Sequence, residues 1–196
     1  MPEDKLEKRV VLGCGIFETE LTRVLKNQTR YDVELVWLKS GLHTRTDLLA
    51  ATLAGELESR GLLDNPELRI LFGANCLLDL DENLKSRLKF LPTDNCLTAM
   101  LGRPRLRELE EGRTMVVTAS WIRKIYLEPD LGLPLWDPAD MRMNLGRYDR
   151  ILILDTGLES FSDEEILNAY DLMGVVLEFE PCSLVYFQNL VMGFLA

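Results

Sequence analysis

The chain has 196 residues, of which 47% are hydrophobic, so it is long and apolar enough to bury a core without a disulfide framework. A formal net charge of −10 and a pI near 4.7 would repel the phosphate backbone of a nucleic acid and an anionic lipid surface. The first residues are charged and lack the pattern of a signal peptide, and no apolar run reaches the roughly 18 residues of a membrane helix. We therefore expect a single cytoplasmic domain over residues 1–196, with neither nucleic acid nor a membrane among its partners.

Short apolar runs alternate with amphipathic segments along the first half of the chain. Residues 9–13 and 32–38 predict strands, because they are rich in apolar, β-branched and aromatic side chains. Residues 16–27 between them have the spacing of an amphipathic helix. A strand, a helix and a second strand in this order predict a right-handed crossover and a parallel sheet. Residues 47–60 predict a second helix, and residues 68–73 a third strand.

The same alternation continues through the second half. Further strands are predicted over residues 87–91, 114–118, 149–155 and 175–179. Further helices are predicted over residues 96–101, 103–113, 120–122, 162–173 and 183–194. The proline-rich residues 127–138 predict a long loop or lid. We expect an α/β fold, a three-layer sandwich around one mostly parallel sheet that is Rossmann-like or flavodoxin-like.

Three of the four cysteines follow predicted strands. Cys14 follows the first strand, Cys76 the third and Cys96 the fourth, and the only histidine, His43, follows the second. Because the carboxyl ends of parallel strands meet at one edge of a sheet, these side chains are expected to lie near one another. Three thiolates and an imidazole are suitable ligands for a tetrahedral zinc ion. Their spacing lacks a CxxC pair, so the alternative is that the cysteines are small buried apolar residues.

A catalytic interpretation uses the same residues differently. Cys96 is expected in the first turn of a helix, where the helix dipole lowers the pKa of a thiol. A thiol enzyme with Cys96 as nucleophile and His43 as base is therefore an alternative to a metal site. Cys182 follows the last strand without polar companions, and we assign it a structural role.

Five motifs occur in a recognisable order along the chain. They are LGCG at 12–15, GLHTRTDLL at 41–49, LFGANCLLDL at 71–80, PTDNCLTAMLG at 92–102 and TASWIRK at 118–124. Together they resemble a bacterial and archaeal family of unknown function, the one numbered 1638 among the domains of unknown function. The resemblance implies an α/β protein from anaerobic or methyl-metabolising microbes, sometimes found with corrinoid-dependent methyltransferases. It supplies no settled biochemical activity.

The chain departs from this family at one position of the candidate site. Where the family typically has a histidine two residues before the cysteine that matches Cys96, this sequence has Asp94. A carboxylate can replace an imidazole as a zinc ligand, but not as a base whose pKa is near neutrality. The departure therefore favours a metal site over catalysis by a histidine base.

The sequence as a whole predicts a metal or metallocofactor site formed by Cys14, Cys76 and Cys96, with His43 or Asp94 completing it. Zinc is the first expectation, and an iron–sulfur or corrinoid group is the open alternative. A second hypothesis is a non-catalytic accessory protein whose acidic surface binds a methyltransferase or corrinoid protein. The thiol enzyme is the third hypothesis, and the sequence predicts neither a substrate nor an oligomeric state.

Overall fold

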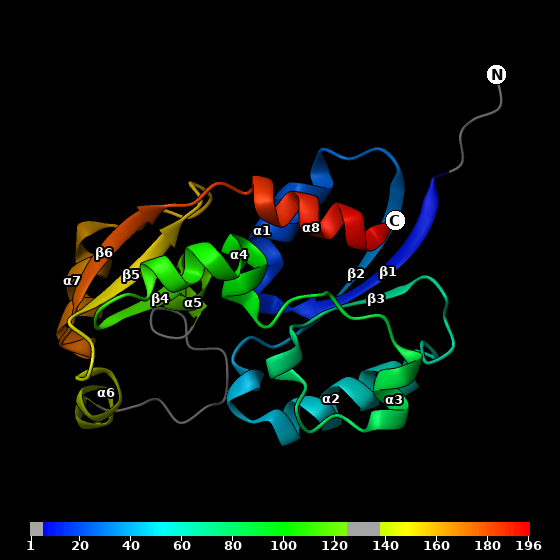
Figure 1. Cartoon of the computed structure of the whole chain (residues 1–196), viewed down its shortest axis with the longest axis horizontal. Helices are drawn as coiled ribbons and strands as arrows, with labels where there is room; N and C mark the ends of the chain where they lie inside the picture. Colours follow the sequence, from blue (N-terminus) through cyan, green and yellow to red (C-terminus); the bar gives the residue numbers. More distant parts are fainter. Residues whose placement is uncertain (1–5, 125–137) are drawn as a thin grey trace.

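The structure, a computed structural model, describes residues 6–124 and 138–196 of the chain. The strands in these two ranges form two three-stranded sheets, and neighbouring strands pair in parallel (Figure 1). The predicted α/β class and the parallel strands are therefore confirmed, whereas the strands are divided between two sheets instead of joined in one. The organisation of the chain as one domain stays a prediction.

The first sheet has the order β2 (Tyr31–Leu38), β1 (Glu7–Cys14) and β3 (Leu68–Leu71). The helical segments of this half are η1 (Gly15–Phe17), α1 (Glu18–Lys26), η2 (Leu42–Thr44), α2 (Thr46–Ser59), η3 (Ala74–Cys76) and α3 (Glu82–Arg87). Gly13 of β1 pairs with Trp37 of β2 and with Leu71 of β3. The three strands therefore end at nearly the same level, and the loops that follow them share one edge of the sheet.

The second sheet has the order β4 (Thr114–Thr118), β5 (Arg150–Asp155) and β6 (Val176–Pro181). The helices of this half are α4 (Cys96–Leu109), α5 (Ala119–Ile122), α6 (Pro138–Leu145), α7 (Asp163–Met173) and α8 (Val185–Leu195). Helix α8 returns to the first sheet, where it lies beside α1, and α2 and α3 lie on the other side of that sheet (Figure 1). Phe187 of α8 stacks on Phe17, with 5.1 Å between the ring centroids, and the side chain of Arg9 donates to the carbonyl of Leu195 at 2.7 Å.

Local signals in the sequence account for most element boundaries. The side chain of Asn95 accepts a hydrogen bond from the amide of Thr98 at the start of α4, and Ser162 does the same for Glu165 at the start of α7. Both are capping boxes, which satisfy amides that a helix leaves unpaired in its first turn. Gly61 follows α2 with a φ of +63°, the left-handed conformation that favours glycine.

One predicted element needs correction. Residues 87–91 are not a strand, since only Phe90 forms an isolated bridge, with Ile70, while residues 82–87 form α3. Helix α3 is stabilised at its start by the Asp81 carboxylate, which accepts hydrogen bonds from two backbone amides, and it takes up the first residue of the predicted strand. The helices predicted over 96–101 and 103–113 are confirmed as the two parts of α4, which Gly102 separates with a non-helical φ of +73° and ψ of +155°. The predicted loop over 127–138 lies outside the described residues, except for the first residue of α6.

The buried apolar side chains connect the two sheets. The larger of two clusters contains Leu12 and Ile70 of the first sheet and Leu152 and Leu154 of the second, each at most 4% exposed. A cluster of this kind supplies most of the driving force for folding. Among the described helices, none is long and apolar enough to cross a membrane.

Candidate functional site

Cys14 is the last residue of β1 and lies against the loop that follows β2. Its side chain is buried, and the backbone amides of Ile16 and Gly41 hydrogen-bond to its sulfur. A side chain at Gly15 would place its Cβ 3.0 Å from the Oγ of Ser40. The close approach of these loops therefore depends on a glycine after Cys14, and it brings the η2 loop to the sulfur.

The loop after β3 and the loop before α4 are joined through their backbones. The amide of Ala74 donates to the carbonyl of Thr93, and the amide of Asn75 donates to the carbonyl of Asp94, both at 2.9 Å. A Cβ on Gly73 would lie 2.3 Å from that same carbonyl oxygen of Asp94, so no side chain fits at this position. Each of the two joined loops carries a cysteine, which explains how distant parts of the sequence meet.

These cysteines are Cys76, which ends η3, and Cys96, which is the first residue of α4. Burial first, and then the neighbouring Cys14 and Cys76, raise the pKa of the Cys96 thiol to about 12. Burial, with a smaller contribution from Cys76, raises the pKa of the Cys14 thiol to about 11. Burial also raises the pKa of the Cys76 thiol. The three thiols therefore lie near enough to influence one another, and they are protonated at neutral pH.

The predicted lowering of the Cys96 pKa is wrong. Cys96 does lie in the first turn of α4, but the loss of hydration on burial outweighs the effect of the helix dipole. A thiol that stays protonated at neutral pH is a poor nucleophile. The thiol-enzyme interpretation therefore loses its physical basis.

His43 and Asp94 have different surroundings. His43 lies in η2, two residues after Gly41, whose amide contacts Cys14. Its side chain is exposed, although nearby protein atoms partly desolvate the imidazole and lower its pKa. Asp94 instead accepts a hydrogen bond from Arg103 at 2.5 Å. In residues 6–124 and 138–196, no group of three or more His, Cys, Asp and Glu side chains is arranged to hold a metal ion. The metal-ligand role of these residues stays a prediction.

The second sheet contributes a cation that the sequence alone did not single out. Lys124, just after α5, donates to the carbonyl of Gly15 at 2.7 Å and to the carboxylate of Glu18 at 2.8 Å. Its positive charge favours the thiolate form of Cys14, although burial has the larger opposite effect. Lys124 ends the TASWIRK motif, so that motif brings a positive charge near Cys14.

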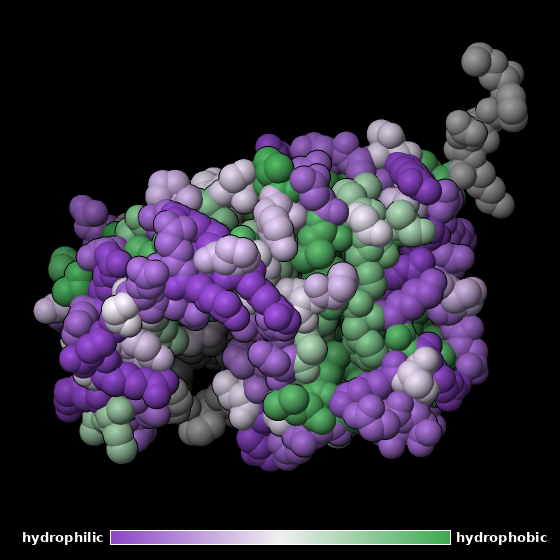
Figure 2. All heavy atoms as spheres, viewed as in Figure 1, coloured by the Kyte–Doolittle hydropathy of each residue, from purple (hydrophilic) through white to green (hydrophobic). Residues whose placement is uncertain are grey.

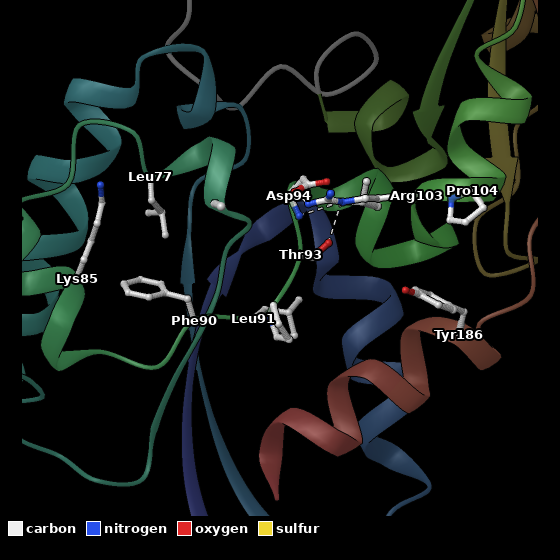
Figure 3. A pocket seen from close by; sticks show the side chains of 12 residues that line it. Leu77, Lys85, Phe90, Leu91, Thr93, Asp94, Arg103, Pro104 and Tyr186 are labelled. Carbon is white, nitrogen blue, oxygen red and sulfur yellow. Dashed lines mark hydrogen bonds and ion pairs between the residues drawn. The ribbon is translucent and has the colours of Figure 1, made fainter.

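A pocket of about 720 Å³ is lined in part by the two joined loops (Figure 3). Leu77, Phe90 and Leu91 form its apolar wall, and Tyr186 of α8 points toward it from the other side. The side chain of Arg103 reaches across the pocket toward the joined loops (Figure 3). On the face seen in Figure 2, apolar surface forms a band below α8. Sequence patterns missed this pocket because it depends on the return of α8 to the first sheet.

A buried glutamate also escaped the sequence analysis. Glu20 of α1 is 1% exposed, and its Oε2 atom has no hydrogen-bond partner among the described residues. A signal was present, since Glu20 lies four residues before the buried Val24 and one before the buried Leu21, on the apolar face of α1. An acidic residue on the apolar stripe of a helix indicates a buried charge or proton.

Comparison with known proteins assigns a family. Residues 37–191 match the family described as "Protein of unknown function (DUF1638)". Cys76, Cys96 and His43 lie inside the matched residues, whereas Cys14 lies before them. No curated protein and no solved structure matches the chain. Since the match covers more than three quarters of the sequence, the chain belongs to the DUF1638 family, whose function is unknown.

Proposed function

We propose that the chain binds a thiophilic metal ion, or a cofactor that contains one, through Cys14, Cys76 and Cys96. The supporting observation is that three thiols, at the end of β1, at the end of η3 and at the start of α4, lie near enough at one edge of the first sheet to influence one another electrostatically. Thiolates select zinc, copper(I) and iron–sulfur clusters over hard cations. Zinc is the first expectation, and iron–sulfur and corrinoid groups are the alternatives. Elemental analysis of the cysteine variants tests this proposal.

The surroundings of the thiols suit a bound metal. Coordination deprotonates a thiol outright, so the protonated state of the three cysteines in the absence of metal is no obstacle. Three thiolates exceed the charge of a divalent ion by one negative charge. Lys124 and the amides that contact Cys14 supply compensating positive charge and dipoles. Binding requires the three side chains to close on the ion, because they do not form a ligand set as they stand.

His43 is the better fourth ligand. Its loop contacts Cys14 through Gly41, whereas the Asp94 carboxylate is already paired with Arg103. We expect His43→Ala to weaken zinc binding by more than the roughly tenfold to hundredfold that loss of an outer-shell partner costs, while three cysteine ligands remain. Competition with a chromogenic chelator measures this change. Asp94→Asn is the control and should bind zinc like the wild type, and the opposite ranking of the two variants would assign the fourth position to Asp94.

A second candidate function is binding without catalysis, and the pocket favours it. An apolar wall beside the exposed guanidinium of Arg103, which pairs with Asp94 and has further N–H donors, suits a small organic molecule with one anionic group. With 8-anilinonaphthalene-1-sulfonate as the probe, Arg103→Ala should weaken binding about tenfold, because a charge-assisted hydrogen bond is lost. Arg107→Ala, on the exposed side of the same helix, should change nothing. Equal affinities in all three proteins would remove this candidate.

The accessory-protein hypothesis stays a prediction. Its support is the net charge of −10, which favours a partner with a basic surface. Affinity purification from the native organism followed by mass spectrometry should identify a methyltransferase or a corrinoid protein. If neither is enriched over a control purification, this hypothesis fails while the metal proposal stands.

A further inference from the structure

A buried carboxyl pair lies where α1 meets the carboxyl edge of the second sheet. Glu20 comes from α1, and Glu159 comes from the loop after β5. The side chain of Glu159 is only 9% exposed, and Ser120, which is fully buried, donates to its Oε1 at 2.5 Å and also interacts with Glu20. The Oε2 atom of Glu20 has no partner in the described parts of the chain. Two acidic side chains therefore share one buried space between the sheets.

The charged and titratable groups that face Glu20 are Glu159, Lys124 and Cys182. Lys124 is engaged by the carbonyl of Gly15 and by Glu18, and Arg123 binds Glu159. Lys124 and Arg123 thus donate their hydrogen bonds to groups other than Glu20, while Glu159 places a negative charge beside Glu20. Burial, with a smaller contribution from Glu159, raises the pKa of Glu20 to about 7, against the lowering effects of its own backbone amide, Lys124 and Ser120. Glu20 therefore keeps its proton under mildly acidic conditions.

The same residues hold the two sheets together at this point. The hydroxyl of Thr19 donates to Glu159 at 3.3 Å, and Lys124 donates to the Gly15 carbonyl at 2.7 Å. If Glu20 loses its proton, a second carboxylate charge is buried next to Glu159, and the hydrogen bonds from Ser120 and from its own backbone amide do not offset the loss of hydration. Burying an unpaired charge costs more free energy than opening a small contact to water.

We propose that Glu20 and Glu159 form a proton-operated latch between the two sheets. With a proton on Glu20 the latch is closed, and loss of that proton loosens the contact between α1 and the segment from β4 to Lys124. The latch does not depend on metal binding by the cysteines, so it stands or falls separately from the proposed function.

The direction and the range of the pH dependence follow from the raised pKa. The closed state holds the proton up to about pH 7, whereas a hydrated glutamate releases it near 4.5. The equilibrium constant for opening therefore rises about tenfold per pH unit between these two values, and it stays nearly constant at higher pH. Between pH 5 and pH 8 the opening equilibrium should rise about a hundredfold.

Hydrogen exchange of the full chain, followed by mass spectrometry and corrected for intrinsic amide rates, measures this opening. In the wild type, protection of α1 and of residues 114–124 should fall about a hundredfold from pH 5 to pH 8, while α2 keeps its protection. Glu20→Gln should remove the pH dependence, because its side chain is neutral at both values. Glu34→Gln, an exposed position on β2, is the matched control and should behave like the wild type.

Several outcomes would overturn the latch. One is a wild type whose protection does not change with pH, and another is a Glu20→Gln variant that keeps the dependence. Glu159→Gln provides a second test if Glu20→Gln does not fold, since removal of the neighbouring charge should move the transition to lower pH. Full restoration of protection at pH 8 by magnesium chloride alone would instead make the carboxyl pair a cation site.

Discussion

Cys96→Ser is expected to abolish metal retention while leaving the fold intact. A wild-type chain purified anaerobically should contain about one equivalent of metal, as a mononuclear thiolate site does. Serine keeps the size of the side chain but removes the soft thiolate donor, and two thiolates are too few to retain the ion through gel filtration. Cys76→Ser should have the same effect, because both residues lie on the two joined loops. Plasma mass spectrometry measures the metal content, and circular dichroism confirms the fold.

Cys182→Ser is the matched control for this experiment. Cys182 is as buried as Cys14, at 8% exposure, but its electrostatic neighbours are glutamates and an arginine instead of the other cysteines. It should keep the full metal content of the wild type. Equal loss from all three serine variants would show that the metal depends on the stability of the chain and not on the three thiols.

Gly73→Ala is expected to lower the free energy of unfolding by about 3 kcal/mol, in the upper range for overpacking. Its Cβ would lie 2.3 Å from the Asp94 carbonyl oxygen, and a backbone atom cannot rotate away as a side chain can. The two joined loops must therefore separate, and the hydrogen bonds of Ala74 and Asn75 are weakened or lost. Urea denaturation followed by circular dichroism measures the change.

Gly55→Ala provides a control of opposite sign for this substitution. Gly55 lies inside α2, and a Cβ there would have no heavy atom within 4 Å. Alanine should therefore raise the free energy of unfolding by about 1 kcal/mol, since glycine costs conformational entropy in a helix. If Gly73→Ala were as stable as the wild type, the tight contact between the joined loops would be refuted. Gly73→Ala should also lose metal, because Cys76 and Cys96 move apart.

The sequence predicted the first sheet well because its signals are local. The apolar run from 9 to 13 and the β-branched run from 32 to 38 are strands, and the capping residues Asn95 and Ser162 begin helices where expected. The division of the strands into two sheets depends on contacts between distant residues, which periodicity does not report. The segment from 87 to 91 has the composition of a strand, but Asp81 starts a helix just before it and leaves it a single bridge.

The candidate site was predictable in position but not in its electrostatics. Parallel strands and the loops after them place Cys14 and Cys76 at one edge, as their positions at the ends of predicted strands indicated. Cys96 reaches them by a different route, through hydrogen bonds between two loops. Its raised pKa depends on burial, which sequence position near a helix start does not reveal. Lys124 comes from the second sheet, and no local pattern connects it to Cys14.

X-ray absorption spectroscopy at the metal edge of the anaerobically purified and reconstituted chain tests the central proposal most directly. A zinc site of this kind should show a first shell of three sulfur atoms at about 2.3 Å and one lighter atom near 2.0–2.2 Å, and the sulfur count should fall in Cys76→Ser after reconstitution at high zinc. A chain that stays free of metal after reconstitution, or a shell of nitrogen and oxygen alone, would contradict the proposal that the three cysteines bind a metal.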